Sequence, residues 1–565
     1  MHPNISTCGG GQDAMQPHAF LAFCCGLFGI VAQTLLLREC LTIFSAGEIW
    51  IVSLLGTWSL AAAAGASFAR SLRRTPSRET LCLAFIPVFL LQYLAILLFA
   101  GSGRDAGLIL PLHEILGRSL LIAGPGGAIA GLLVSALGRP ILGRYLWIAV
   151  GGVVGGAGAA VMLGVGTSVS AVFLSAALVA CSGAAWSAWT GARKRGWLEA
   201  ICLVAVSAAL ILRADVPISR VVQQWRWHRA APGGTLAGSF RTAQAEYLYG
   251  MDGDRWVVAR GGGVHEVLGD RTEAGRIAAI ALSQNFAAKR ILVIGRGLAV
   301  CERFLRTPSV EAVDWIDPDP QYIQELLAHV PERFGVSDPR LHCLAGAVRA
   351  ALAERQGAYD VVVVNLPRIV EGRLEELTSV EFFESAQKSL RPLGVAVVGI
   401  VGDRDPSDGE PGHQGACVES ALEAVFAQTI LVPDGPRTFF VSAAEACLQV
   451  FPVVLQTRFG LVENAGEIFP VELLEQVYRP DLSVKRAESY DAVNIPKERL
   501  ISHDGRPSHR LCGLLQAASR SGVSLDKPVQ AFSRGGLPCR LRGCVWRIRR
   551  LLWPSRAGRR LPFDA

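Results

Sequence analysis

A run of seven long apolar stretches in the first two hundred residues constrains this chain more than any other feature. They lie at roughly 17–37, 48–69, 80–101, 118–138, 145–166, 168–191 and 196–213, and each is nearly free of charge. About 20 apolar residues allow a helix to cross the hydrocarbon core of a bilayer. One such stretch could be a buried helix of a soluble core, but seven in succession predict a polytopic α-helical membrane domain over residues 1–213. The composition, 51% hydrophobic and 18% charged, is also too apolar for a purely soluble protein.

The N-terminus and the cysteines exclude several classes of protein. The first sixteen residues contain no Lys or Arg, and no convincing small-residue cleavage site follows them, so the first apolar stretch is interpreted as a span rather than as a signal peptide. The 14 cysteines are scattered, and none forms a CxxC pair. We therefore predict neither a disulfide framework nor a metal site.

The net charge of +7 is concentrated in three connections between the apolar stretches and in the C-terminal tail. The basic residues of the connections are Arg70, Arg73, Arg74 and Arg78 after the second stretch, Arg139 and Arg144 after the fourth, and Arg193, Lys194 and Arg195 after the sixth. The positive-inside rule places such connections in the cytoplasm. Seven spans would then leave the rest of the chain outside, whereas six or eight would leave it inside.

After the membrane domain the pattern changes to that of a soluble α/β protein. We expect a linker at 214–236, a small β-hairpin domain at 237–270, a Rossmann-like domain at 271–450, a mixed region at 451–523 and a basic tail at 524–565. Within the Rossmann-like part, apolar strands alternate with helices. The predicted parallel strands are Ile291–Ile294, Val310–Ile316, Arg340–Leu344, Val361–Asn365 and Gly394–Val401. This alternation indicates a doubly wound sheet.

A glycine turn follows the first of these strands. Gly295 and Gly297 come directly after Ile291–Ile294, and Asp317 ends the next strand about twenty residues later. In Rossmann-like folds the glycines let the backbone approach a nucleoside, and the later acid accepts hydrogen bonds from the ribose hydroxyls. A glycine pair alone is weak support for a nucleoside-binding site. Together with the strand, the helix and the acid at this spacing, it predicts a nucleoside site.

The order of these parts resembles that of the membrane-bound spermidine synthase-like proteins, in which spanning helices precede a polyamine aminopropyltransferase domain. The resemblance rests on "GIVAQTLLLRECLTIFSAGEIW" in the membrane half and on "ILVIGRG", "SVEAVDWIDPDPQYI", "YDVVVVNLP" and "LTSVEFFESAQKSLRPLG" in the soluble half. It implies a methyltransferase-type Rossmann-like fold. It also implies transfer of an aminopropyl group from decarboxylated S-adenosylmethionine, or use of a related nucleoside, with no covalently bound cofactor.

The resemblance assigns roles to individual residues. Gly295, Gly297, Asp317 and Asp319 match the cosubstrate-binding positions of the family. Two further positions are matched on the substrate side by Gln244 and Glu273. The acid that serves amine activation in the family corresponds here to Asn365. A neutral amide can hydrogen-bond an amine, but it cannot take up its proton.

Several other positions depart from the family pattern. Arg296 replaces the middle glycine of the turn, Arg368 stands where a second acid is usual, and Thr378 replaces a tyrosine. These changes imply impaired or altered catalysis. One alternative is that another acid replaces the lost one, and the candidates are Glu266, Glu273, Glu371 and Glu375. For the dipeptide His265-Glu266, we expect an exposed position in a hairpin rather than a site.

Three functions therefore remain open. They are those of an aminopropyltransferase, of a non-catalytic sensor of a nucleoside or polyamine, and of a transport-associated membrane protein. The expected partners are the lipid bilayer and small polyamine and nucleoside ligands, without nucleic acid, and a homodimer is left open. Because a nucleoside cosubstrate is found in the cytoplasm and the Arg-rich tail suits an anionic leaflet, we expect a multi-pass inner-membrane protein with a cytoplasmic soluble half.

Overall fold

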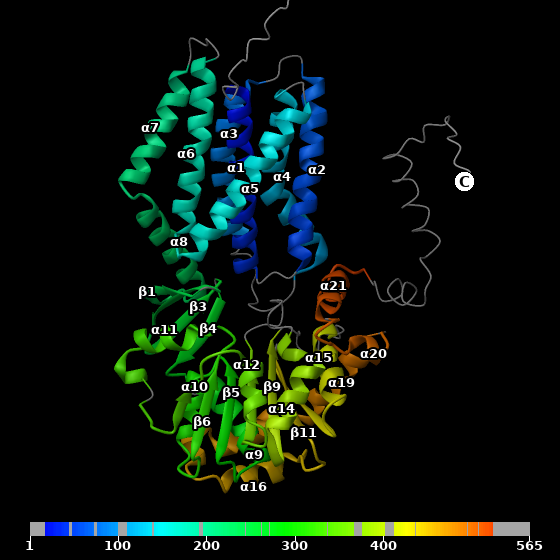
Figure 1. Ribbon diagram of the computed structural model, residues 1–565. Coiled ribbons are helices and arrows are strands. Elements are labelled where there is room, and N and C mark those ends of the chain that lie inside the picture. The colour runs from blue at the N-terminus through cyan, green and yellow to red at the C-terminus, as the bar shows by residue number, and fades with distance from the viewer. Residues whose placement is uncertain are drawn as a thin grey trace, which may run out of the picture.

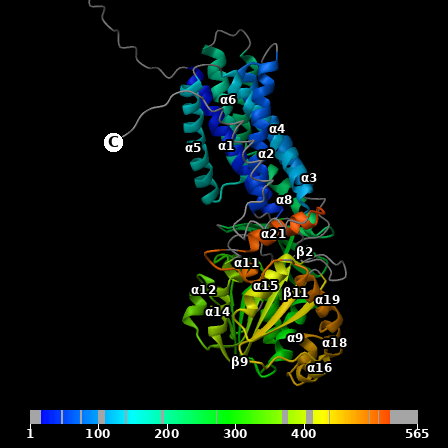
Figure 2. The ribbon, with the colours of Figure 1, turned by 90° about the vertical axis from the view of Figure 1, so that its right-hand side faces the viewer.

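Two bodies make up the protein, a layer of long helices and an α/β body at one end of it (Figure 1). The view turned by 90° shows the same two bodies (Figure 2). The computed structural model describes residues 17–44, 48–72, 76–99, 110–137, 141–190, 196–242, 244–261, 263–270, 272–335, 337–366, 376–401, 412–435, 437–493, 495–506 and 508–523. Statements about the structure concern these residues.

The apolar stretches form the helices of the first body. They are α1 (Pro17–Ile43), α2 (Glu48–Ser71), α3 (Arg78–Phe99), α4 (Leu112–Ala136), α5 (Ile141–Gly164), α6 (Val169–Thr190) and α7 (Trp197–Ile211), followed by α8 (Asp215–Ala230). Among the described residues, α1 to α6 are long and apolar enough to cross a membrane. The 15-residue α7 joins α8 at a bend of 75°, and this pair passes the same test of length and composition only as one broken span. The predicted helical domain is present, and its insertion in a membrane stays a proposal.

Glycines allow these helices to pack closely. A Cβ atom at Gly26 of α1 would overlap the backbone of α5, and one at Gly151 of α5 would overlap the backbone of α1. Gly65 of α2 and Gly131 of α4 face each other's helices in the same way. Small residues at such contacts let helix backbones approach and gain van der Waals contact, as is common among membrane helices.

The helical body touches the α/β body at one end only of the helices. The carbonyl oxygen of Thr42 at the end of α1 lies against Gly261, and Arg241 donates a hydrogen bond to the carbonyl of Gly166 between α5 and α6. At the start of α4, His113 lies 3.2 Å from the Ser521 hydroxyl. The last residues of α2, α4 and α6 and the first residues of α3, α5 and α7 therefore lie at the opposite end of the helical body (Figure 1). Arg70 in the last turn of α2 and Arg78 at the start of α3 belong to that end.

The segment expected as a linker at 214–236 is mostly the helix α8. Its polar composition concealed the helix α8, whose Arg226 and Trp227 are buried by contacts with other elements. Trp227 packs against Leu248 and Val257 of the following sheet. Tertiary contacts thus stabilise a helix that its composition alone does not favour.

The small β domain is a four-stranded antiparallel sheet. Its strands are β1 (Thr235–Arg241), β2 (Glu246–Asp252), β3 (Arg255–Arg260) and β4 (Gly263–Leu268), paired in chain order. Tyr247 and Trp256 belong to the same apolar core as the first helix of the next unit, α9 (Thr272–Gln284). The sheet is therefore a cover on the larger body rather than a unit with a core of its own.

A seven-stranded sheet forms the centre of the α/β body. Its order is β10-β11-β9-β8-β5-β6-β7, parallel except for β11. The strands are β5 (Arg290–Gly295), β6 (Ala312–Ile316), β7 (Leu341–Cys343), β8 (Tyr359–Asn365), β9 (Leu390–Val401), β10 (Gln428–Asp434) and β11 (Arg437–Ala443). The predicted alternation of strands and helices is confirmed. The strand order reverses between β5 and β8, and ligands of such folds bind at the carboxyl ends of the strands at this point.

Some helices cover this sheet, and others follow it in the chain. Those that cover it are α10 (Leu298–Leu305), α11 (Tyr322–His329), α12 (Val348–Glu354), α14 (Val380–Ser389) and α15 (His413–Glu423). The predicted mixed region after β11 contains α16 (Pro452–Gly460), α17 (Ala465–Ile468), α18 (Leu474–Val477), α19 (Pro480–Asp491), α20 (Lys497–Leu500) and α21 (His509–Ser519). Short 3-10 turns lie at Glu332–Phe334, Glu376–Thr378 and Val471–Leu473. The basic tail, 524–565, lies outside the described residues.

Candidate functional site

The glycine turn lies where the strand order reverses. Gly295 is paired in register with Asn365, the last residue of β8. It has φ +91°, and a Cβ atom there would overlap the Asn365 carbonyl oxygen, so glycine is required on both grounds. A Cβ atom at Gly297 would overlap the indole of Trp315, whose Nε1 donates to the Gly295 carbonyl over 2.8 Å. Both glycines singled out in the sequence are therefore fixed by their close neighbours.

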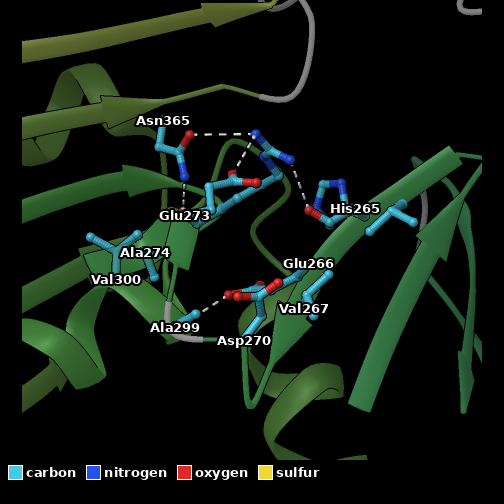
Figure 3. Close-up of a pocket in the computed structure, with 11 residues that line it drawn as sticks. His265, Glu266, Val267, Asp270, Glu273, Ala274, Ala299, Val300 and Asn365 are labelled. Carbon is cyan, nitrogen blue, oxygen red and sulfur yellow. Dashed lines mark hydrogen bonds and ion pairs between the residues drawn. The ribbon is translucent and has the colours of Figure 1, made fainter. Parts of the chain in front are cut away.

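Arg296 and Asn365 are hydrogen-bonded to each other at this turn, and Figure 3 shows Asn365 with these contacts as dashed lines. The Asn365 amide Nδ2 donates to the Arg296 carbonyl over 2.8 Å, and the Arg296 backbone N–H donates to the Asn365 carbonyl over 3.0 Å. The Arg296 guanidinium lies 3.5 Å from the Asn365 Oδ1 and donates to the His265 carbonyl over 3.2 Å. Two departures from the family pattern thus form one hydrogen-bonded pair.

A small cavity of about 70 Å³ opens beside this pair. It is lined by Val264, His265, Glu266, Val267, Asp270, Glu273, Ala274, Arg296, Ala299, Val300 and Asn365. These residues come from β4, the start of α9, the glycine turn, the start of α10 and the end of β8 (Figure 3). Of the site residues predicted from the sequence, Asn365 and Glu273 line this cavity.

His265 and Glu266 are buried, so the expected exposed hairpin position is wrong. The reason is that β4 is covered by α10 and α11, elements that follow it in the chain. Glu266 accepts hydrogen bonds from the Tyr322 hydroxyl over 2.9 Å and from the Ala299 N–H over 3.1 Å. Burial raises the pKa of Glu266 and lowers the pKa of His265, which also lies near Arg260. The burial of Glu266 could have been predicted from the alternation of side chains along β4, because Glu266 lies on the same face of the strand as the buried Leu268.

Glu273 is half exposed and already paired. It forms an ion pair with Arg437, and its Oε1 lies 3.8 Å from the Arg296 guanidinium. A carboxylate shared by two arginines is less available to an incoming amine. Of the other replacement acids considered, Glu371 and Glu375 lie outside the described residues, as does Arg368. Thr378 lies in a 3-10 turn and is fully buried.

The two predicted ribose-side acids lie together after β6. Asp317 accepts a hydrogen bond from the Asp319 N–H over 2.7 Å. Asp319 in turn accepts from the Thr242 hydroxyl over 2.5 Å and from the Tyr247 hydroxyl over 3.1 Å. Burial, with the neighbouring Asp319 carboxylate as a lesser cause, raises the pKa of Asp317 to about 7. Hydrogen bonds from Thr242 and Tyr247 of the small β domain therefore position Asp319, and the sequence alone did not predict these contacts.

Gln244, predicted to be on the substrate side, belongs to this same neighbourhood. Its amide donates to the Pro318 carbonyl over 3.1 Å and does not line the cavity. Within the described part of the chain, no three His, Cys, Asp or Glu side chains gather in a way that could hold a metal ion.

Comparison with known proteins gives one matching family and several relatives. Residues 272–399 match the family described as the spermine/spermidine synthase domain. Spermidine synthase 2 of Arabidopsis thaliana is 34% identical over 110 residues, which are 19% of this chain and 32% of that protein. Putrescine N-methyltransferase 1 of Nicotiana tabacum is 30% identical over 115 residues, 19% of this chain and 29% of that protein.

Among solved structures, spermidine synthase from Thermotoga maritima is 14% identical with a TM-score of 0.36, over 45% of this chain and 87% of that chain. This chain spans about a third of the length of the curated relatives named above. The family match runs from the start of α9 into β9, so it contains the glycine turn, both acids and Asn365.

Proposed function

We propose that this chain is a membrane-anchored, spermidine synthase-like protein with impaired aminopropyl transfer; the family match over residues 272–399 supports its spermidine synthase-like part. Its soluble half would bind decarboxylated S-adenosylmethionine or a related nucleoside at the glycine turn. The backbone of Gly295 and Gly297 would approach the nucleoside, and Asp317 would accept hydrogen bonds from its ribose. The residues at the site are less suited to the transfer step.

The reaction itself sets the requirements for that step. An amine nitrogen attacks the propyl carbon bonded to the sulfonium, the C–S bond breaks with its electron pair on sulfur, and methylthioadenosine leaves. The attacking nitrogen must first lose its proton, and free amines have a pKa of about 10. A carboxylate near that nitrogen therefore governs the rate at neutral pH.

The hydrogen bonding of Asn365 is the observation that carries the proposal. Its neutral amide takes up no proton, and it is tied to Arg296, whose cation repels an incoming ammonium. Glu266 and Glu273 also line the cavity, but each is engaged by other groups of the protein. Loss of a general base typically lowers a rate by about 10²- to 10⁴-fold, and we expect a deficit of that size here.

An assay of methylthioadenosine release tests this proposal. The full chain in detergent is given decarboxylated S-adenosylmethionine and putrescine, and a spermidine synthase is assayed beside it. We expect a rate below about 1% of that of the synthase. A comparable rate would contradict impaired catalysis and point to Glu266 or Glu273 as the base.

Two variants show whether Asn365 and Arg296 act as a unit. Asn365→Asp alone is expected to stay slow, because the ionised carboxylate cannot donate to the Arg296 carbonyl and meets the guanidinium instead. Arg296→Gly combined with Asn365→Asp removes the cation and supplies the acid, so methylthioadenosine release should rise. The matched control is Asp481→Asn, an exposed acid of α19 that does not line the cavity. If the double variant is no faster than the parent, the lost acid is not what limits the rate.

A second candidate, a sensor that couples ligand binding to the membrane helices, has its own observation in favour. The segment 241–247 contacts both bodies. Arg241 reaches Gly166, and Glu246 pairs with Arg226, which also pairs with Glu39 of α1. The same segment holds the ribose-side acids through Thr242 and Tyr247. Calorimetry with methylthioadenosine and with spermidine tests the sensor, which needs binding of at least one of them without turnover.

Membrane anchoring and the remaining partners are part of the proposal. The six long apolar helices support an inner-membrane location, with the lipid bilayer, a nucleoside and a polyamine as partners and no role for nucleic acid. A homodimer is still left open. The expectation of a cytoplasmic soluble half requires an even number of crossings, whereas α7 and α8 taken as one broken span make the number odd.

A further inference from the structure

The 5′ substituent of a bound nucleoside is called its tail, and the part of the site that would receive it is called the tail end. We propose that Arg296 makes the tail end selective for a tail that carries a carboxylate, over a tail that ends in an ammonium group alone. This inference rests on the proposed function, because it assumes that a nucleoside binds at the glycine turn. It names the substrate class of that same site: an adenosine-type sulfonium compound with an amino-acid tail.

The strand order determines where the tail of a bound nucleoside lies. Asp317, which would bind the ribose, follows β6, and Asn365 ends β8, with β5 and its glycine turn between them. A nucleoside with its ribose at β6 extends its 5′ substituent along the turn toward β8. There it meets the Arg296 guanidinium and the Asn365 amide, both of which line the cavity.

The positive charge of Arg296 is only partly compensated. The residue is 8% exposed, its guanidinium donates to the neutral oxygens of His265 and Asn365, and its Nε has no hydrogen-bond partner among the described residues. The nearest acid, Glu273 at 3.8 Å, is held more closely by Arg437. Arg296, Arg437 and Glu273 together therefore leave one positive charge at the cavity.

Among the described residues, the other acids of the cavity form no ion pair with Arg296. Glu266 instead accepts hydrogen bonds from Tyr322 and Ala299. Asp270 forms an ion pair with Arg255 at 3.6 Å. A guanidinium binds a carboxylate through charge-assisted and often bidentate hydrogen bonds, whereas it repels an ammonium group at the same place. The tail end of the site thus favours a carboxylate.

S-adenosylmethionine and decarboxylated S-adenosylmethionine form a matched pair of probes, because they differ by one carboxylate. Their affinities for the full chain in detergent can be measured by calorimetry. We expect S-adenosylmethionine to bind about tenfold or more tightly, the size expected of one charge-assisted hydrogen bond. Arg296→Ala should remove this preference, and Arg296→Lys should keep part of it because the charge remains.

The control is Arg290→Ala, which removes an exposed arginine at the opposite end of the same strand and should leave the preference unchanged. Circular dichroism establishes that each variant is folded. Equal affinity for the two probes, or tighter binding of the decarboxylated one, would overturn this inference while leaving the nucleoside site intact. If neither probe nor methylthioadenosine binds, the proposed nucleoside site itself fails, and the selectivity fails with it.

Discussion

The raised pKa of Asp317 predicts that ligand binding at the proposed ribose position depends on pH. The carboxyl group must be ionised to accept hydrogen bonds from both ribose hydroxyls, and its pKa in the folded protein is about 7. Binding of methylthioadenosine should therefore strengthen as pH rises from 6 to 8, by up to about tenfold per unit below the pKa. Calorimetry across this range measures the slope. Asp317→Asn should bind weakly and without that slope, whereas the control Asp481→Asn, at an exposed acid, should behave as the parent. A parent protein without any slope contradicts the assignment.

The Asp317 carboxyl group also affects the stability of the folded protein, and its contribution to stability falls as pH rises. Its folded pKa lies above the unfolded value of 3.8, so between about pH 4 and 7 the folded state retains a proton that the unfolded state has released. Its contribution to stability is therefore fully present below pH 4 and is lost as pH rises through 7. Burial of Asp317 costs stability at neutral pH in exchange for a polar group at the proposed ribose position.

At the residue scale, the sequence predicted those site residues whose roles follow from local sequence patterns. Gly295, Gly297 and Asp317 were found because a strand, a tight turn and a second strand leave local patterns. The pairing of Arg296 with Asn365 joins residues 69 positions apart in the chain, so only the fold brings them together. Glu266 was misjudged for a related reason, since the helices that bury β4 come later in the sequence.

At the element scale, α8 and the segment 241–247 form the joint between the two bodies. Arg226 is buried between the Glu39 and Glu246 carboxylates, 3.3 Å from the latter. Although burial alone would raise the pKa of Glu246, Arg226 and Arg241 hold it below the usual value. Neither the helix nor its ion pairs were predictable from a segment that reads as polar and rich in arginine and tryptophan.

Arg226→Ala should destabilise this joint strongly, because it leaves the buried Glu39 carboxylate without its cation and the partly buried Glu246 with Arg241 alone. Breaking a buried pair in this way costs about 3–5 kcal/mol. Thermal unfolding of the full chain in detergent should show a clear fall in Tm, while Arg220→Ala, an exposed arginine of the same helix, should change it little. The triple change Glu39→Gln, Arg226→Met and Glu246→Gln removes all three charges and should recover much of the loss. Similar Tm values for Arg226→Ala and Arg220→Ala would show that the ion cluster does not hold the bodies together.

At the scale of the whole molecule, the arrangement of the helices bears on which side the soluble half occupies. The end of α1, the start of α4 and the α5–α6 connection all touch the α/β body. The last residues of α2, α4 and α6 and the first residues of α3, α5 and α7 lie at the far end, and α7 returns the chain from there (Figure 1). If the helical layer crosses the membrane, Arg70 of α2 and Arg78 of α3 are on the side opposite to the soluble half.

The positive-inside rule then gives a specific prediction, that the soluble half lies outside the cytoplasm. A topology reporter fused after residue 523, and a second one inserted in the α4–α5 connection, should report opposite sides, with the inserted one in the cytoplasm. A cytoplasmic signal from the first reporter would instead restore the cytoplasmic placement and show that the soluble half outweighs the charge bias of the connections. The outcome also bears on function, because a site outside the cytoplasm is separated from cytoplasmic decarboxylated S-adenosylmethionine. That separation would agree with a site in which Asn365 and Arg296 replace the groups that transfer requires, and it would favour ligand binding coupled to the helices through Arg226 over synthesis of a polyamine.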